Sequence, residues 1–179
     1  GSGVGGPCLP INSYQFLNTA KRMGSNLSII ESGRKINEHM PEHVIKLTLD
    51  AFEECNKSVQ GTTILILGVS YKPNVKDIQL TPAEIIIKKL QELGANIRIY
   101  DPYFKTNDVF GIKCEENLDD AFTNVNATII VTGHDEFKKY EISKFSQTID
   151  KILIDTRGII EPTSAKDANL VFRGLGRGQ

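Results

Sequence analysis

The sequence contains no tryptophan and only two methionines, three histidines and three cysteines among its 179 residues. Cys8, Cys55 and Cys114 are too few and too scattered for a disulfide framework or a zinc cluster, so reduced thiols are expected. A net charge of -1 excludes a polybasic surface for nucleic acid or membrane. The apolar runs fall far short of the roughly 20 residues that cross a bilayer, and the amino end carries no signal-peptide pattern. These absences predict a soluble, cytoplasmic protein.

The clearest pattern covers residues 62–102 and reads as strand, loop, helix and strand. Residues 62–68 form a short apolar run, typical of a strand buried on both faces of a parallel sheet. After a polar loop, Thr81 and Pro82 suit the cap and first turn of a helix that ends at Gly94. Residues 95–100 form the second strand, which completes a βαβ unit.

Further strands are predicted at residues 127–132, 151–156 and 169–172, with short helices near 117–122 and 142–145 and an irregular stretch before Lys113. Strands that alternate with helices at this spacing predict an α/β fold with a doubly wound parallel sheet. We therefore expect a Rossmann-like domain over residues 59–179.

Ligands of such sheets bind beyond the carboxyl ends of the strands, which places the loop of residues 70–77 at the functional edge. Lys72 and the amino end of the helix at Pro82 are candidates to hold a diphosphate together. Arg157 follows a buried strand and is the second candidate for an anion. The alternatives are a solvated Lys72 and a surface pair of Arg157 with Asp155 or Asp101.

A dinucleotide site would need G-x-G-x-x-G after the first strand, where only Gly68 stands. Asp101 could mimic the acid that holds an NAD ribose, but without the glycines we favour a nucleotide other than NAD. Residues 134–136 lie on the same edge, with no mechanism assigned. The match of residues 1–6 to the same glycine pattern is rejected because no strand precedes it.

The remaining amino-terminal stretch is a glycine-rich loop that leads to Cys8 between two prolines. Glycines allow backbone amides to approach a ligand, and prolines restrict the backbone around the thiol. Cys8 is therefore either a nucleophile or an idle residue near the chain end; its reactivity depends on surroundings that the sequence does not show.

A helical segment follows within residues 1–58: a short helix that Gly24 ends, then an apolar stripe over residues 27–55 at helical spacing. Pro41 predicts a kink or a break in this long helix. Part of the stripe is expected to pack on another chain. Residues 39–43 match the zinc-binding pattern H-x-x-E-H, with His39 and His43 at its ends. Pro41 disturbs their helix and no third ligand is evident, so no metal site is expected.

Five stretches together resemble the UDP-sugar 6-dehydrogenases, the family of UDP-glucose and UDP-N-acetylmannosamine dehydrogenases. They are G-V-G-G-P-C-L-P at residues 3–10, L-G-V-S-Y-K-P-N at 67–74 with Asp77 and T-P at 81–82, Y-D-P at 100–102, D-T-R-G at 155–158, and G-L-G-R-G at 174–178. The resemblance implies a helical dimerisation segment, a UDP-sugar-binding domain and NAD-dependent oxidation of the sugar C6 hydroxymethyl to a carboxylate.

The resemblance also implies roles for single residues. Cys8 would be the nucleophile of a thiohemiacetal and thioester route. The substrate contacts would come from Gly3, Val4, Gly5, Gly6, Tyr71, Lys72 and Arg157. The partners would be a UDP-sugar and a second copy of the chain, bound through the long helix.

Two residues depart from the family pattern. Asn12 stands where the family usually has an aspartate, and an amide can position a group but cannot exchange a proton. Gln79 stands where the family has an arginine that helps to hold NAD, which weakens that cofactor contact.

The family's NAD domain and catalytic lysine, which lie upstream of the cysteine loop, have no counterpart before Gly1. We therefore expect the carboxyl-terminal portion of a longer enzyme, with NAD bound mainly outside this chain, weak UDP-sugar binding at best and no dehydrogenase activity by itself. The alternative is a nucleotide-binding or oligomerisation module without chemistry.

Overall fold

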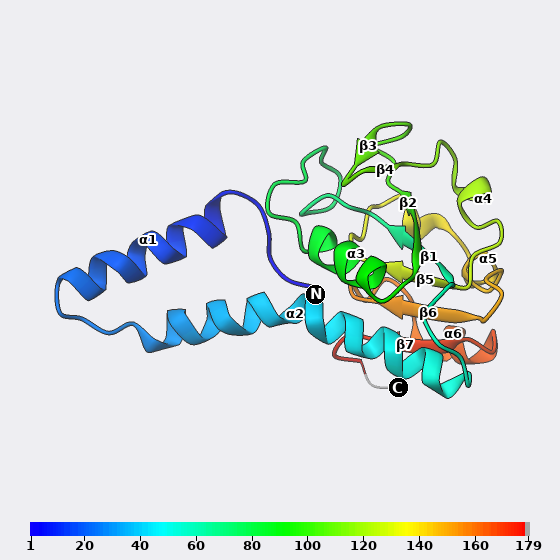
Figure 1. The fold of residues 1–179 in the computed structure, drawn as a ribbon, viewed down its shortest axis with the longest axis horizontal. Helices are drawn as coiled ribbons and strands as arrows, with labels where there is room; N and C mark the ends of the chain where they lie inside the picture. Colours follow the sequence, from blue (N-terminus) through cyan, green and yellow to red (C-terminus); the bar gives the residue numbers. More distant parts are fainter. Residues whose placement is uncertain (178–179) are drawn as a thin grey trace.

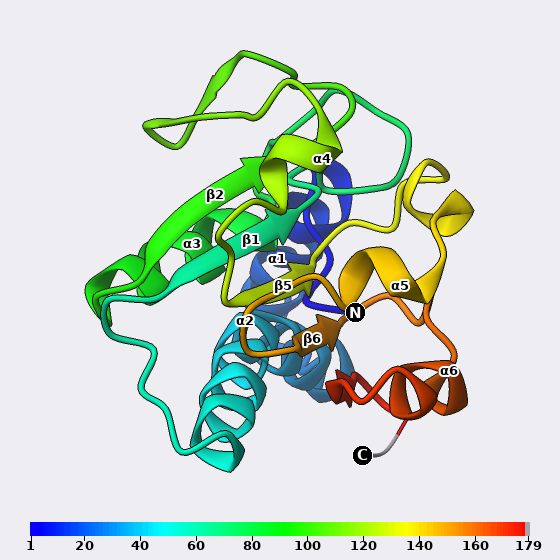
Figure 2. The same cartoon turned by 90° about the vertical axis from the view of Figure 1, so that its right-hand side faces the viewer.

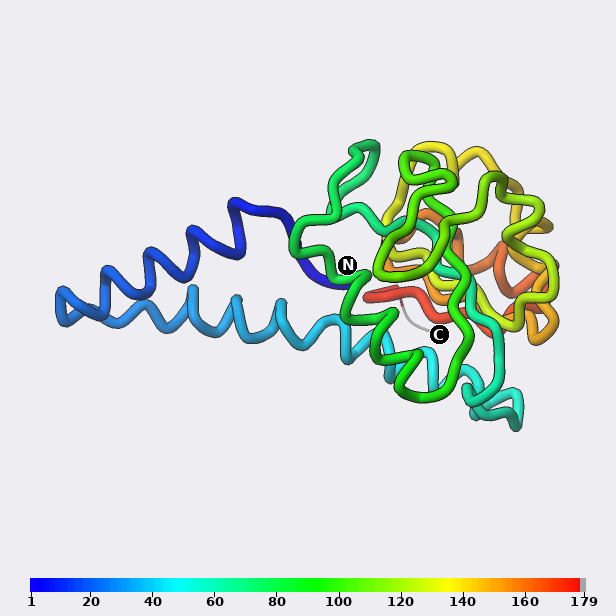
Figure 3. The backbone as a smooth tube through the Cα atoms, turned by 45° about the horizontal axis from the view of Figure 1, so that its top comes forward, coloured from blue at the N-terminus to red at the C-terminus, as the bar shows by residue number. Residues whose placement is uncertain are grey.

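A computed structural model describes residues 1–177 as a helical hairpin joined to a parallel sheet (Figure 1). The hairpin consists of α1 (Cys8–Arg22) and the first half of α2 (Ser28–Glu54). It projects away from the sheet, whereas the second half of α2 lies along the sheet body (Figure 3). Gly178, in the tail that resembles the UDP-sugar dehydrogenases, lies outside the described residues.

Five parallel strands form the sheet in the order β2-β1-β5-β6-β7. Their bounds are β1 Thr63–Leu67, β2 Asn96–Tyr100, β5 Ala127–Ile130, β6 Ile152–Asp155 and β7 Val171–Gly174. The chain leaves β1 for β2 on one side and returns to β5 on the other, so the strand order reverses beside β1. The doubly wound α/β sheet is confirmed, and a crevice is expected at this reversal.

Helices cover both faces of the sheet (Figure 2). On one face, α3 (Pro82–Glu92) and the second half of α2 pack over Ile64 and Ile66. On the other face lie α4 (Leu118–Ala121), α5 (Ile142–Phe145), α6 (Pro162–Asp167) and the 3-10 turn η1 (Phe137–Lys139). There, Leu65 and Leu67 enter a second buried cluster. Because alternate residues of β1 point to opposite faces, both clusters share this strand.

The predicted elements are largely present, with four differences. A small antiparallel pair, β3 (Asp108–Val109) and β4 (Ile112–Lys113), occupies the stretch expected to be irregular. Neither α6 nor η1 was predicted, since both are too short to show a period. The last strand lies two residues later than expected.

The helix α2 runs unbroken through Pro41, so the break that this residue suggested is absent. A proline lacks the N–H that would bond to the carbonyl four residues earlier, which here belongs to Asn37. That carbonyl faces the amino-terminal loop: a Cβ built on Gly3 would lie 3.4 Å from it. The proline therefore stands one turn beyond the point where the loop meets the helix.

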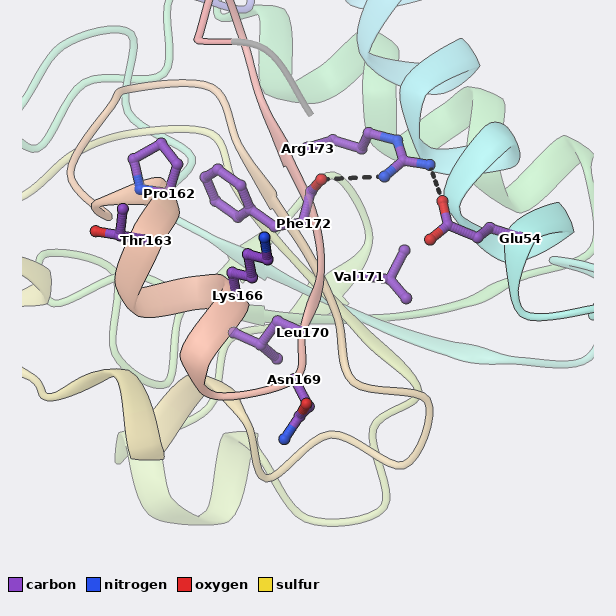
Figure 4. A pocket seen from close by; sticks show the side chains of 9 residues that line it. All are labelled: Glu54, Pro162, Thr163, Lys166, Asn169, Leu170, Val171, Phe172 and Arg173. Atoms are coloured by element: carbon purple, nitrogen blue, oxygen red, sulfur yellow. Dashed lines mark hydrogen bonds and ion pairs between the residues drawn. The ribbon is translucent and has the colours of Figure 1, made fainter.

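A hollow of about 630 Å³ lies along the free edge of β7 rather than at the carboxyl ends of the strands (Figure 4). Arg173 donates a hydrogen bond to the outward carbonyl of Phe172 and pairs with Glu54 of α2. A side chain that occupies an edge carbonyl protects the sheet from pairing with another strand. This hollow therefore lies at a sheet edge that the Arg173 side chain protects. In the part of the chain that the structure describes, no helix combines the length and apolar character needed to cross a membrane.

Candidate functional site

A hollow of about 450 Å³ lies between the amino-terminal loop, the start of α1 and the loop that follows β1. Its walls contain nearly all the residues predicted to act together: Gly3, Val4, Gly5, Gly6, Cys8, Tyr71, Lys72 and Arg157, with Pro7, Leu9 and Pro73. Asn12 and Gln79 do not belong to this lining. Segments far apart in the sequence thus meet in one cavity.

The loop after β1 carries Tyr71 and Lys72 and is braced by its own polar groups. The Tyr71 N–H donates to the carbonyl of Asp77 over 3.0 Å, and the Ser70 hydroxyl donates to the carbonyl of Val75 over 2.7 Å. The Lys72 ammonium lies 5.6 Å from the centroid of the Tyr71 ring, within cation–π range. The loop is therefore folded back on itself by hydrogen bonds between its own residues.

The amino-terminal loop packs directly against this braced loop. A Cβ on Gly6 would lie 2.7 Å from the Tyr71 ring, and Gly6 has φ +82°, so only glycine fits there without strain. A Cβ on Gly5 would lie even closer to the carbonyl oxygen of Leu80. The Gly6 N–H also donates to the carbonyl of Gln79 over 2.8 Å. The glycines thus permit close packing between two segments of the protein.

Asn37 of α2 holds the amino-terminal loop from the other side, a role that sequence reasoning missed. Its Oδ1 accepts the Val4 N–H over 2.7 Å, while its Nδ2 donates to the Val4 carbonyl over 3.3 Å. One amide side chain therefore satisfies both backbone groups of Val4, as a neighbouring strand would. A single asparagine on a helix gives no pattern from which this could be predicted.

Arg157 is fixed by the strand end that carries it. The Asp155 carboxylate accepts the Arg157 and Gly158 N–H groups over 2.8 and 2.9 Å. The Arg157 Nε donates to the carbonyl of Val131 over 2.6 Å, which leaves the terminal guanidinium nitrogens toward the hollow. Burial lowers the pKa of this guanidinium, although it stays charged at neutral pH. Asp155 accepts backbone N–H groups and so does not form the surface pair with Arg157 that was the alternative to anion binding.

Behind the hollow, the fully buried Asp101 joins three loops. Its carboxylate accepts the Val69 N–H over 2.8 Å and the Tyr103 N–H over 2.9 Å, and it lies 3.0 Å from Nε2 of His134. Burial by itself would raise the pKa of Asp101, but the hydrogen bonds from His134 and the backbone leave it below its ordinary value. Asp101 is therefore a buried carboxylate with its acceptors engaged, and this role was also missed.

Cys8 is the first residue of α1 and is exposed, beside the free N–H groups of the first helical turn. Asn12 lies one turn later on the same face and is also exposed. The other two cysteines differ: burial raises the pKa of Cys55, and it raises the pKa of Cys114 to about 12. Cys8 is the thiol that opens to the hollow.

One expectation for this region needs correction. The amino end of α3 lines a separate hollow with α2, and its Pro82 packs on Gly3, so Lys72 shares its cavity with Arg157 rather than with Pro82. The predicted helix start itself is confirmed, since the Thr81 hydroxyl accepts the Ala83 N–H.

The two histidines of the H-x-x-E-H motif are exposed on α2, and His39 lies 2.6 Å from the Lys35 carbonyl. Within the described residues, no group of three or more metal-ligating side chains comes together.

The residues beyond β1 and β2 do not fit NAD. Asp101, the position of a ribose-binding acid, is fully buried, and its oxygens are occupied by N–H groups of the protein. The loop that would carry the glycine fingerprint is instead folded around Tyr71. Gln79 is exposed and contributes its backbone carbonyl to the amino-terminal loop.

Comparison with known proteins accounts for this arrangement. Residues 65–162 match the model of the UDP-binding domain of the UDP-glucose/GDP-mannose dehydrogenase family. The chain belongs to this family. The match covers the sheet from β1 to the start of α6, including the loop with Tyr71 and the strand end with Arg157.

Individual relatives match almost the whole chain. A UDP-N-acetyl-D-mannosamine dehydrogenase from Pyrococcus horikoshii is 32% identical over 179 residues, covering 99% of this chain. A UDP-glucose 6-dehydrogenase from Bacillus subtilis is 31% identical over a similar span. The chain spans about 40% of the length of these relatives.

Two solved structures show the same fold. The P. horikoshii UDP-N-acetyl-D-mannosamine dehydrogenase superposes with a TM-score of 0.87 over 99% of this chain and 40% of the other. An NDP-N-acetyl-D-galactosaminuronic acid dehydrogenase from Methanosarcina mazei has a TM-score of 0.90 at 28% identity, over 99% of this chain and 39% of the other. The likeness includes the hairpin as well as the sheet.

Replacing Asn37 with alanine is expected to loosen the amino-terminal loop, because Val4 loses the partner of both its backbone groups. Amide hydrogen exchange of residues 3–7 should accelerate about tenfold, as expected for the loss of about 1–2 kcal/mol of local hydrogen bonding. Asn18→Ala, at an exposed position of α1, is the control. Unchanged protection in the Asn37 variant would show that the glycines and Tyr71 hold the loop without it.

Proposed function

We propose that this chain binds a UDP-sugar and supplies the cysteine nucleophile of an NAD-dependent UDP-sugar 6-dehydrogenase. The observation that supports the proposal is the shared hollow, in which Lys72 and Arg157 lie with the exposed thiol of Cys8. Residues 1–58 would carry the cysteine loop and the dimerisation helix, and residues 59–179 the nucleotide site.

The two cations suit a diphosphate in different ways. Arg157 is half-buried and fixed by its backbone and by Val131, so it can offer a planar pair of donors at a constant position. Lys72 is exposed on its loop and supplies a mobile point charge. Tyr71 adds an aromatic wall that holds both Lys72 and the glycine loop in place. The glycine loop would contact the sugar between the diphosphate and Cys8.

In the proposed chemistry, the thiolate of Cys8 adds to a C6 aldehyde to give a thiohemiacetal. Its oxidation gives a thioester, which water then hydrolyses to the carboxylate and the free thiol. The first turn of α1 favours negative charge near the sulfur. Asn12, one turn away, would orient water or an oxyanion without exchanging a proton. The oxidation of the C6 alcohol to the aldehyde and the oxidation of the thiohemiacetal to the thioester would each need NAD as hydride acceptor. Neither hydride transfer is assigned to the residues described here.

Lys72→Met should weaken the binding of UDP about tenfold, because a charge-assisted hydrogen bond to phosphate contributes roughly 1.5–3 kcal/mol. Isothermal titration calorimetry at two salt concentrations measures the effect, which should shrink as salt rises. Lys76→Met is a matched control in the same loop, where the lysine contacts Asn107 instead. Equal losses in the two variants, or no heat with UDP in the parent chain, would contradict the proposed site.

Alkylation of the thiols tests whether Cys8 belongs to the substrate site. Iodoacetamide should modify Cys8 first, and a saturating UDP-sugar should slow this reaction at least fivefold by covering the hollow. Cys114, buried and with its pKa raised to about 12, is an internal control that should stay unmodified in the folded protein. A rate indifferent to UDP-sugar would favour a nucleotide-binding or oligomerisation module in which Cys8 performs no chemistry.

We also propose that the hairpin forms a homodimer. It projects beyond the sheet body (Figure 3). It exposes large apolar side chains, namely Leu9, Ile11, Phe16, Met23, Ile29 and Ile36. Apolar side chains gathered on a projecting hairpin are typical of a surface that a second chain covers.

A double variant, Phe16→Glu with Ile36→Glu, is expected to convert the dimer into a monomer because it places four charges in the shared surface. Light scattering after size-exclusion chromatography measures the mass. Ile149→Glu, at a residue 60% exposed on the sheet body, is the matched control. A parent chain that is monomeric at every concentration would contradict the dimer.

A further inference from the structure

Two loops meet behind the candidate substrate hollow and are joined through Asn74. This residue lies two positions after Lys72 and has a left-handed backbone with φ +60°, which asparagine tolerates. Its side chain donates to Asp135 over 2.7 Å and accepts the Asp135 N–H over 3.1 Å. Its backbone N–H donates to Nδ1 of His134 over 3.0 Å. Three hydrogen bonds thus link the loop after β1 to the loop after β5.

The hydrogen-bond partners of His134 define which ring nitrogen donates and which accepts. Nδ1 accepts a backbone N–H and therefore carries no proton. Nε2 must then carry the proton and donates it to the Asp101 carboxylate over 3.0 Å. His134 and Asp101 are both fully buried, so water does not replace the bond between them at low cost. The Asp101 contact thus selects the tautomer that can accept from Asn74.

The ring is also held by its neighbours. Tyr103 lies with its centroid 5.2 Å from the imidazole, and Phe137 meets the ring nearly edge-on at 5.4 Å. An imidazole between two aromatic rings has little freedom to turn about its side-chain bonds. The acceptor that faces Asn74 is therefore fixed in position as well as in protonation state.

We propose that His134 is a positioning residue for UDP binding, which acts by anchoring Asn74 and so fixing the peptide that carries Tyr71 and Lys72. The proposal rests on the proposed function of the hollow. His134 itself does not line the hollow, so its effect must pass through the loop. A loop held in its bound shape loses less freedom when the ligand binds, which raises affinity without any added contact.

Two substitutions separate the two bonds of the ring. In His134→Asn, the amide oxygen falls near the place of Nδ1 and can still accept from Asn74. In His134→Gln, the amide nitrogen falls near the place of Nε2 and can still donate to Asp101, but the Asn74 N–H is left unpaired. We expect the affinity for UDP, measured by calorimetry, to fall about tenfold in the Gln variant and less than threefold in the Asn variant.

A second measurement needs no ligand. Exchange of the Asn74 amide in the free protein should accelerate about tenfold in His134→Gln and change little in His134→Asn. Nitrogen NMR of the parent chain should show His134 protonated on Nε2 alone. Failure of the parent chain to bind UDP would refute the proposed function, while the exchange rates and the tautomer would still decide whether His134 anchors the loop.

Two further variants guard against a general loss of stability. Phe145→Leu, at the buried last residue of α5, should lower the thermal midpoint without changing UDP affinity. Asn74→Gly keeps the left-handed backbone and the N–H but removes the two side-chain bonds to Asp135. Its effect on UDP affinity should be less than additive with that of His134→Gln, because both act through one anchor. Equal losses in the Asn and Gln variants, or strict additivity with Asn74→Gly, would overturn the proposal.

Discussion

The arrangement of this protein's functional edge depends on a carboxylate enclosed at the end of a strand. Asp101 follows β2, yet its hydrogen bonds reach the loop after β1 through Val69, its own loop through Tyr103 and the loop after β5 through His134. A buried charge is costly unless donors surround it, and here the donors come from separate segments. The free energy that stabilises the carboxylate therefore also fixes these segments relative to one another.

The same principle recurs at β6, where Asp155 accepts three backbone N–H groups from the turn that carries Arg157, including that of Ile160 over 2.9 Å. In both cases an acidic side chain at the carboxyl end of a strand accepts hydrogen bonds from the protein itself. This explains why Asp101, which resembles a ribose-binding acid in the sequence, does not line the hollow. Lys72 and Arg157 face it instead, with positive charge suited to a diphosphate.

The sequence was sufficient to predict the parallel sheet, because its strands are continuous apolar runs between turn residues, as in residues 64–67. It was also sufficient to predict that Lys72 and Arg157 lie near one another, since the carboxyl ends of parallel strands share one edge, and both side chains line the same hollow. Asn37 and His134 could not be predicted in the same way. Each acts through one pair of atoms on a residue distant in sequence, and no periodicity or spacing records such a contact. The short β3–β4 pair was not predicted for a related reason, since strands of two residues show no alternation of apolar and polar residues.

The long helix α2 connects the two halves of the proposed function. Its second half is buried with the sheet through Val44 and Phe52, whereas its first half carries Asn37 and the exposed apolar face of the hairpin. Pro41 lies between these halves and removes one helical hydrogen bond beside the attachment of the cysteine loop. A second chain packed on the hairpin would press on the same helix that holds Val4. Dimerisation and the position of Cys8 are therefore expected to be coupled, because one helix carries both contacts.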